Sequence, residues 1–188
     1  ANIFQCDERN IFFASTGVIG EKLPYEKIIQ HFNHLKENLS SSGLKAASNA
    51  ILTTDLKPKI YTKKFKISGK IFTISAIAKG SGMIMPNMAT MLAFIFTDFA
   101  IDKKTLSIIT KKSIHESFNR ISVDGDTSTS DTVFVATTNK KNLKLTKDKK
   151  EKNKMKNVSM FNGTYTIRRR FFAYLSPEVH VEATIRLV

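Results

Sequence analysis

The sequence predicts a mixed α/β fold, because segments with the period of strands alternate with segments with the period of helices as far as residue 137. Its 188 residues are enough for one domain of ordinary size or two small ones, and a hydrophobic share of 41% excludes a wholly disordered chain. The longest apolar run, residues 91–96, is far shorter than the roughly 20 residues that a membrane-spanning helix needs. We therefore expect helices packed on sheets and no membrane partner.

The first third of the chain predicts one strand followed by two helices. Residues 10–14 are apolar and rich in strand formers, and two glycines shortly after them indicate a turn. Apolar residues three or four positions apart between residues 25 and 39 predict a helix. Pro24 precedes it at a position where a first helical turn tolerates proline. A second helix is expected over residues 43–51.

The middle of the chain predicts a hairpin, a buried strand, a helix and a further strand. Strand formers at residues 60–67 and 71–77 flank a Ser-Gly-Lys turn, which is the pattern of a hairpin. Residues 79–82 contain two glycines and are expected to form a flexible loop. The remaining elements are expected over residues 91–96 (strand), 103–118 (helix) and 132–137 (strand).

The formal net charge of +14 suggests a nucleic-acid binder, but the charge is concentrated in one stretch. Residues 139–170 hold nine lysines and three arginines against two acidic residues. The lysine run lacks the aromatic side chains on which single-strand binders stack bases, so we expect no nucleic-acid partner. A nucleic-acid binder stays as the non-enzymatic alternative, to be tested by deleting the run and measuring salt-dependent binding.

The chain therefore divides by composition into three parts. The first, residues 1–138, carries the alternating strands and helices. A lysine-rich segment over residues 139–157 is expected to be disordered, because it has few apolar side chains to offset the entropy of ordering. A tail over residues 158–188 follows, in which residues 179–187 alternate like a strand.

Several common cofactor and metal motifs are incomplete. The glycines at 80 and 82 lack the third glycine of a dinucleotide fingerprint, and the acidic stretch from residue 124 lacks the glycine and the glutamate of a calcium loop. His31 and His34 have no further ligands nearby in the sequence, so we expect no metal site. The single cysteine, Cys6, excludes an internal disulfide and is typical of a reducing compartment.

Small hydroxyl residues beside glycines are the remaining candidates for chemistry. A serine or threonine can act as a nucleophile, and a threonine at a chain N-terminus can use its own amine as the base. Backbone N–H groups near glycine can form an oxyanion hole, and a lysine can bind a carboxylate. From the residues alone, two interpretations stay open for each of these segments: a catalytic role, or an ordinary role as a turn, a helix end or a surface charge. The segments are Thr16-Gly17, Thr53-Thr54-Asp55, Lys79 and Ala89-Thr90.

Four longer segments contain these candidates and follow one another in a characteristic order. They read ASTGVIGE at 14–21, AILTTD at 50–55 followed by Pro58-Lys59, IAKGSGMIMPNMATMLAF at 77–94, and NRISVDGDTSTSDT at 119–132. In this order they resemble the ornithine acetyltransferase family, which are the glutamate N-acetyltransferases of arginine biosynthesis. The third segment resembles the family's self-cleavage segment, and the whole resemblance covers about residues 10–138.

The resemblance implies a role for each candidate residue. Thr90 matches the threonine that attacks the carbonyl of Ala89, so that the chain is cut between them and Thr90 becomes an N-terminal nucleophile. Thr16 and Gly17 match the pair that forms the oxyanion hole. The positions that match substrate contacts are Thr53, Lys79 and Thr90, with Lys79 facing a carboxylate.

The reaction that the resemblance implies is a ping-pong acetyl transfer. Acetylornithine acylates the threonine, ornithine leaves, and glutamate accepts the acetyl group; some members also use acetyl-CoA, as a substrate, and no cofactor is expected. The implied fold is the α/β arrangement shared with self-processing aminopeptidases, and an aminopeptidase of this kind is the competing enzyme class. The implied assembly is a cytoplasmic heterotetramer of two α and two β chains, because the cleavage products stay together.

The sequence also departs from the family pattern. Family members are considerably longer, and a downstream acidic motif and C-terminal piece that complete their substrate site have no match after residue 138. We therefore expect a fragment with an incomplete fold, without transferase activity of its own and with poor self-cleavage. Residues 139–188 are expected to be the product of a frameshift, with genuine divergence as the alternative.

Overall fold

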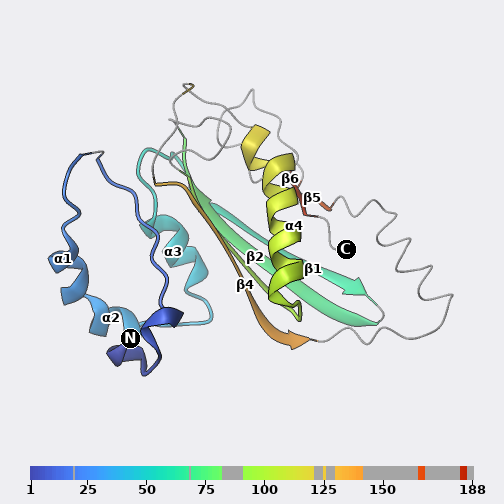
Figure 1. Cartoon of the computed structure of the whole chain (residues 1–188), viewed down its shortest axis with the longest axis horizontal. Helices are drawn as coiled ribbons and strands as arrows, with labels where there is room; N and C mark the ends of the chain where they lie inside the picture. Colours follow the sequence, from blue (N-terminus) through green and yellow to red (C-terminus); the bar gives the residue numbers. More distant parts are fainter. Residues whose placement is uncertain are drawn as a thin grey trace.

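The computed structural model describes residues 1–18, 20–67, 69–81, 91–120, 125, 130–141, 165–167 and 183–185. A four-stranded mixed sheet forms its centre (Figure 1). The strands are β1 (Lys59–Ile67), β2 (Lys70–Lys79), β3 (Leu92–Phe99) and β4 (Thr132–Lys141), and they lie in this order across the sheet. β2 runs antiparallel to both β1 and β3, whereas β4 runs parallel to β3.

The strand register aligns the end of β2 with the beginnings of β3 and β4. Lys79 pairs with Leu92 of β3, and Leu92 pairs in turn with Thr132 of β4. On the other side of β2, Ala78 pairs with Lys59 at the beginning of β1. Residues from four separate stretches of sequence therefore meet at one end of the sheet.

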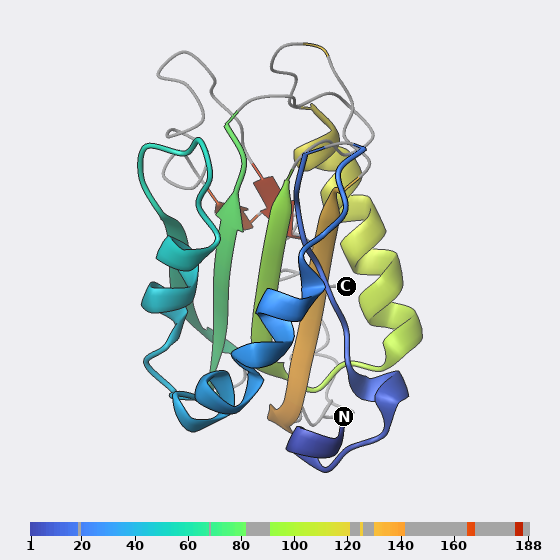
Figure 2. The ribbon, with the colours of Figure 1, turned by 90° about the vertical axis from the view of Figure 1, so that its left-hand side faces the viewer.

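Helices cover the two faces of the sheet unequally. The crossover helix α4 (Lys103–Glu116) connects the parallel strands β3 and β4 and lies on one face, where a 3₁₀ turn, η3 (Phe118–Arg120), follows it. Its first turn is capped by Asp102, whose side chain accepts from the backbone N–H of Thr105 at 2.9 Å. The N-terminal 50 residues lie over the other face (Figure 2).

The N-terminal region consists of short elements joined by irregular segments. They are η1 (Asn2–Phe4), η2 (Glu8–Asn10), α1 (Tyr25–Gln30), α2 (Phe32–Glu37) and α3 (Leu44–Ala50). Near the other end of the chain, β5 (Tyr165–Ile167) and β6 (Ala183–Ile185) form a separate antiparallel pair. The described residues contain no helix that is both long enough and apolar enough to cross a membrane.

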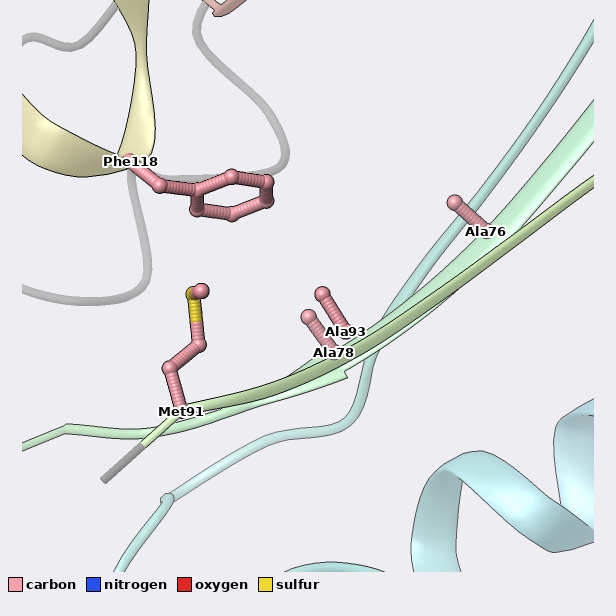
Figure 3. Packing of buried hydrophobic residues seen from close by; sticks show 5 residues of the cluster. All are labelled: Ala76, Ala78, Met91, Ala93 and Phe118. Carbon is pink, nitrogen blue, oxygen red and sulfur yellow. The ribbon is translucent and has the colours of Figure 1, made fainter. Parts of the chain in front are cut away.

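The main hydrophobic cluster lies between the sheet and the end of α4. Phe118 extends its ring over three alanines of the sheet, and Met91 closes the cluster at the beginning of β3 (Figure 3). The alanines are small enough to leave room for the ring, and all of these residues are at most 9% exposed. They are Ala76, Ala78 and Ala93. Because neighbouring strand residues point to opposite faces, Lys79 faces away from this cluster.

The regular elements of the sheet confirm the predicted mixed α/β class and the hairpin. The expected helix over residues 25–39 is divided at His31, where the backbone N–H bonds three residues back, to Ile28, at 3.1 Å. Neither α1 nor α2 buries a residue, so no packing favours one continuous helix. The predicted helices at 43–51 and 103–118 correspond to α3 and to α4 with η3.

The strand predicted over residues 10–14 is wrong. η2 ends at Asn10, and residues 11–18 have no regular structure. Phe12 and Phe13 are 69% and 77% exposed. The ring of Phe12 contacts the ring of Phe134 at a centroid distance of 5.5 Å, so this segment passes over the face of β4 and not along a strand edge. Apolar content predicts a strand only where a neighbouring strand can accept its backbone hydrogen bonds.

β4 continues three residues beyond the predicted boundary at residue 138. Its last residue, Lys141, donates to Asp98 Oδ2 at 2.7 Å and to the carbonyl of Ile71 at 2.8 Å. These contacts give one lysine of the basic run a place in the sheet. Residues 142–157, and all of the tail except 165–167 and 183–185, lie outside the described residues.

Replacing Phe118 by alanine should lower the free energy of unfolding by about 3–5 kcal/mol, because the cavity over the three alanines cannot close. Ile108→Ala on α4 is the matched control, since Ile108 is 57% exposed and its truncation should cost no more than about 0.5 kcal/mol. Urea unfolding of the chain measures both values, and equal midpoints would contradict this account of the core.

Candidate active site

A buried lysine marks the end of the sheet where the four stretches of sequence meet. Lys79 is 1% exposed and is the last residue of β2. The sequence predicts it in a flexible loop over residues 79–82, and its ordinary interpretation is a surface charge; both expectations are wrong. The antiparallel ladder continues through Lys79, which pairs with Leu92. Its side chain thus points from a rigid strand end toward the N-terminal region.

The amine of Lys79 joins two threonines that are far from it in the sequence. Nζ donates to Thr16 Oγ1 at 2.7 Å and to Thr53 Oγ1 at 3.3 Å. Thr16 belongs to the irregular segment that crosses the sheet, and Thr53 follows α3. The two threonines are 63 and 26 positions away from Lys79 in the sequence. The fold therefore brings three of the residues singled out in the sequence together in one polar cluster.

Charge and burial act in opposite directions on Lys79. Burial lowers the pKa of its ammonium group, because the charged form loses its water. The carboxylates of Asp55 and Asp131 raise this pKa, and the nearby charge of Lys59 lowers it further. The balance is a lowered pKa, so the cation of Lys79 is poorly solvated and favours an additional anionic partner.

A second cluster fixes the backbone beside Lys79. Asp55 accepts from the backbone N–H of Gly80 with both carboxylate oxygens, at 3.0 and 3.1 Å, and also from Lys59 Nζ. Lys59 Nζ in turn donates to the carbonyl of Gly80 at 3.1 Å. The side chains of Lys59 and Asp55 are 3% and 0% exposed. Sequence reasoning did not single out Lys59, although it stands in the second motif together with Asp55.

Asp131 orders the beginning of β3 at the same end of the sheet. Its Oδ1 accepts from the backbone N–H of Met91, and the backbone N–H of Thr132 donates to the carbonyl of Met91 at 2.9 Å. Oδ2 of Asp131 is buried and has no hydrogen-bond partner among the described residues. Burial raises the pKa of this carboxyl, against the opposing influence of the Met91 N–H and of Lys79. Sequence reasoning placed Asp131 in a motif but gave it no role.

The other residues singled out in the sequence are only partly covered by the structure. Ala89 and Thr90 lie outside the described residues. Gly17 follows Thr16 directly, and a methyl group at its Cβ position would meet nothing within 4 Å. Within the described part of the chain, no three His, Cys, Asp or Glu side chains are grouped so that they could hold a metal ion.

The arrangement is suited to binding an anion next to small hydroxyl groups. Lys79 supplies a buried positive charge, and Thr16 and Thr53 supply hydroxyls that accept from it and keep their own protons available for donation. The pair of Asp55 and Lys59 holds the strand end rigid. Such a site can bind an anion such as a carboxylate, and it lies at the same end of the sheet as Met91, because Lys79 pairs with Leu92.

Lys59→Met should lower the free energy of unfolding by about 3–5 kcal/mol, because it leaves the Asp55 carboxylate buried without its cation. The exposed Lys64 lies on the same strand, and Lys64→Met should change this free energy by at most about 0.5 kcal/mol. Urea unfolding measures the free energy of unfolding of both lysine variants and of Asp55→Asn. A loss for Lys59→Met no larger than for Lys64→Met would contradict the assigned role of this pair.

Comparison with known proteins identifies the family. A family model described as the ArgJ family matches residues 1–163. The glutamate N-acetyltransferase of Methanocaldococcus jannaschii is 49% identical over 141 residues, which cover 72% of this chain and 34% of that protein. The arginine biosynthesis bifunctional protein ArgJ of Staphylococcus aureus is 51% identical over 136 residues, which cover 72% of this chain and 32% of that protein.

The protein of the same name from Caldanaerobacter subterraneus subsp. tengcongensis is 45% identical over 135 residues, again 72% of this chain and 34% of that protein. The chain thus spans about a third of the length of the curated relatives that it matches. The family model also extends beyond the resemblance over residues 10–138, to residue 163. With the family model matching most of its length, the chain belongs to the ArgJ family.

Proposed function

We propose that this chain supplies part of a glutamate N-acetyltransferase, which transfers an acetyl group from N-acetylornithine to glutamate in arginine biosynthesis. The observation that carries the proposal is the contact of the buried Lys79 with Thr16 and Thr53. It gathers residues from three of the four motifs around one charge, and a relative with 49% identity is named glutamate N-acetyltransferase.

The first step of the proposed chemistry is self-cleavage. Oγ of Thr90 attacks the carbonyl carbon of Ala89, and the peptide C–N bond breaks as the proton of the hydroxyl passes to the nitrogen. The product is an ester between Ala89 and Thr90 with a free amine on Thr90. Water then hydrolyses this ester, which leaves a carboxylate on Ala89 and an N-terminal Thr90 with its hydroxyl restored.

The second stage is acetyl transfer through the same hydroxyl. The amine of Thr90 takes the proton of its own Oγ, which attacks the acetyl carbonyl of N-acetylornithine, and ornithine leaves with that proton. The amine of glutamate then attacks the carbonyl carbon of this acetyl ester, the ester bond to Thr90 Oγ breaks, and a proton from the glutamate amine passes through the Thr90 amine back to Oγ, which restores the hydroxyl. The backbone N–H of Gly17 and the hydroxyl of Thr16 stabilise the negative oxygen in each tetrahedral intermediate.

Lys79 and Thr53 bind the substrate in this proposal. Both substrates are amino acids with a carboxylate, and the buried ammonium group of Lys79 provides the opposite charge. The lowered pKa of Lys79 means that this contact weakens as the pH rises into a range where an exposed lysine still carries its charge. The KM of glutamate should therefore increase with pH before an ordinary lysine would titrate.

Because the matched segment covers only about a third of each relative, the tests use a full-length hybrid enzyme. In it, residues 10–141 of this chain replace the matching segment of the Methanocaldococcus jannaschii relative. The hybrid should yield two chains, the second of which begins at Thr90. Thr90→Ala should stay intact, because it lacks the attacking hydroxyl, whereas Thr90→Ser should retain some cleavage. N-terminal sequencing and intact mass identify the products, and an uncut folded hybrid would contradict the proposal.

The cleaved hybrid should release ornithine in proportion to the glutamate supplied, with parallel double-reciprocal lines. Lys79→Met should raise the KM of both substrates roughly 10–100-fold, since a charge-assisted hydrogen bond is lost. Thr16→Val should lower kcat roughly 100–1000-fold with a smaller effect on KM, because an oxyanion donor is lost.

Two variants on β1 are matched controls for these changes. Lys64→Met removes an exposed charge, and Thr62→Val removes a hydroxyl that bonds only Ser75 in the described contacts, at 3.0 Å. Neither should change KM or kcat. Intersecting double-reciprocal lines would exclude the ping-pong mechanism, and release of amino acids from peptides would favour a self-processing aminopeptidase. Transfer from acetyl-CoA in place of N-acetylornithine is measured in the same assay.

A further inference from the structure

We propose that Asp55 is a positioning residue for Lys79: it holds the end of β2 and keeps the ammonium group of the lysine in place for a substrate carboxylate. The proposal rests on the proposed function, in which Lys79 binds that carboxylate. It gives a part in substrate binding to a residue to which the family resemblance assigns none.

The first observation is that the bend between α3 and β1 is bound residue by residue to the end of β2. Each of the residues 53–55 makes a side-chain hydrogen bond to one of the residues 79–81. The pairs are Thr53 with Lys79 at 3.3 Å, Thr54 with Ser81 at 2.7 Å, and Asp55 with Gly80 at 3.0 and 3.1 Å. The bend therefore fixes the strand end that carries Lys79, and Asp55 is the residue of the bend that carries a charge.

The second observation is that side chains hold both backbone polar groups of Gly80. Lys79 pairs with Leu92 and is the last residue of β2, so Gly80 lies just beyond the strand. Its N–H donates to both carboxylate oxygens of Asp55, and its carbonyl accepts from Lys59 Nζ at 3.1 Å. The φ of Gly80 is 137°, in a region that glycine alone adopts readily. Because a glycine rotates easily, these side chains supply the rigidity that the strand no longer provides.

The third observation is the set of charges around Lys79. Burial lowers the pKa of Lys79, and the charge of Lys59 on β1 lowers it further. The carboxylates of Asp55, before β1, and of Asp131, before β4, raise this pKa. The N-terminal segment contributes a neutral hydroxyl, that of Thr16, at 2.7 Å from Nζ. The two members of the buried ion pair therefore have opposite effects, because Asp55 favours the charged form of Lys79 and Lys59 disfavours it.

The consequence for binding is that Asp55 acts on Lys79 in two ways. Through the peptide of Gly80 it fixes the strand end from which the ammonium group reaches Thr16 and Thr53. Through its charge it keeps this group protonated to a higher pH than burial alone would allow. Both effects favour a carboxylate ligand, because a charge-assisted hydrogen bond needs a donor that is both charged and correctly placed.

The test is the pH dependence of the KM of glutamate in the cleaved hybrid enzyme. The carboxylate needs a charged Lys79, so KM rises as the pH passes through the pKa of this lysine. Asp55→Asn should raise KM roughly 10-fold with little change in kcat, and it should move the rise to lower pH by roughly one unit. Lys59→Met breaks the same buried ion pair but should move the rise to higher pH, because it removes a repulsive charge.

Two further variants show whether Asp55 acts through Lys79. In a Lys79→Met background, Asp55→Asn should leave the pH dependence of KM unchanged, because the group that it influences is absent. Asp98→Asn is the matched control, since Asp98 also pairs with a lysine, Lys141, and accepts a backbone N–H, from Thr73 at 2.9 Å. This control lies at the other end of β3 and should change neither KM nor its pH dependence.

The outcomes separate this inference from the proposed function. A wild-type hybrid that transfers no acetyl group overturns the proposed function. An active Asp55→Asn hybrid whose KM rises at the wild-type pH overturns the role of Asp55 alone. A rise that moves in the same direction in Asp55→Asn and Lys59→Met also overturns it, because both variants loosen the strand end and the sign of the charge effect distinguishes them.

If either single variant does not fold, the double variant Asp55→Asn, Lys59→Met provides the second test. It replaces the ion pair by neutral side chains, so neither member of the pair stays buried without its partner. The attraction of Asp55 outweighs the repulsion of Lys59 at Lys79, so the rise in KM should still move to lower pH. A folded double variant with the wild-type profile overturns the proposal. Circular dichroism and thermal unfolding establish which variants are folded.

Discussion

A lysine ammonium group that water does not reach requires hydrogen-bond acceptors and opposite charge inside the protein, and Lys79 obtains both from distant parts of the sequence. Its acceptors, Thr16 and Thr53, come from the irregular N-terminal segment and from the end of α3. Its opposite charges, Asp55 and Asp131, stand before β1 and at the beginning of β4. The sheet register is what allows these groups to meet, so the site and the fold depend on the same strand ends.

The four charges at this end of the sheet are not equivalent, and the difference shows where binding capacity remains. Asp55 is fully occupied by Lys59 and by the N–H of Gly80, which makes this pair part of the framework. Lys79 has hydroxyl partners but no carboxylate within hydrogen-bonding contact among the described residues, and Asp131 retains a buried oxygen. A cation and an anion that each lack one partner leave this end of the sheet with the capacity to bind a ligand that carries groups of both charges.

The sequence was sufficient for the regular elements and insufficient for the contacts between them. Periodicity predicts the hairpin, the helix α4 and the strands β3 and β4, because each of them is amphipathic or apolar in its own right. It fails at residues 10–14, an apolar segment that passes over the sheet and does not pair as a strand. Whether a partner strand lies beside such a segment is decided by the rest of the fold and not by the segment's own residues. It also fails at Lys79, because the burial of a lysine depends on what covers the opposite face. The motifs named Thr16, Thr53 and Lys79, but only the register explains why they form one site.

The position of the proposed cut has a structural consequence. A cut between residues 89 and 90 separates β1 and β2 from β3 and β4, which are neighbours in one sheet. Six residue pairs, from Ile74–Thr97 to Lys79–Leu92, join β2 to β3 across that boundary, and Ala78 and Ala93 are buried against the same Phe118. Opening a connection of this length releases only a modest loop entropy, which grows with the logarithm of loop length. The pairing of β2 with β3 would therefore hold the two products of the proposed cut together without the peptide bond between them.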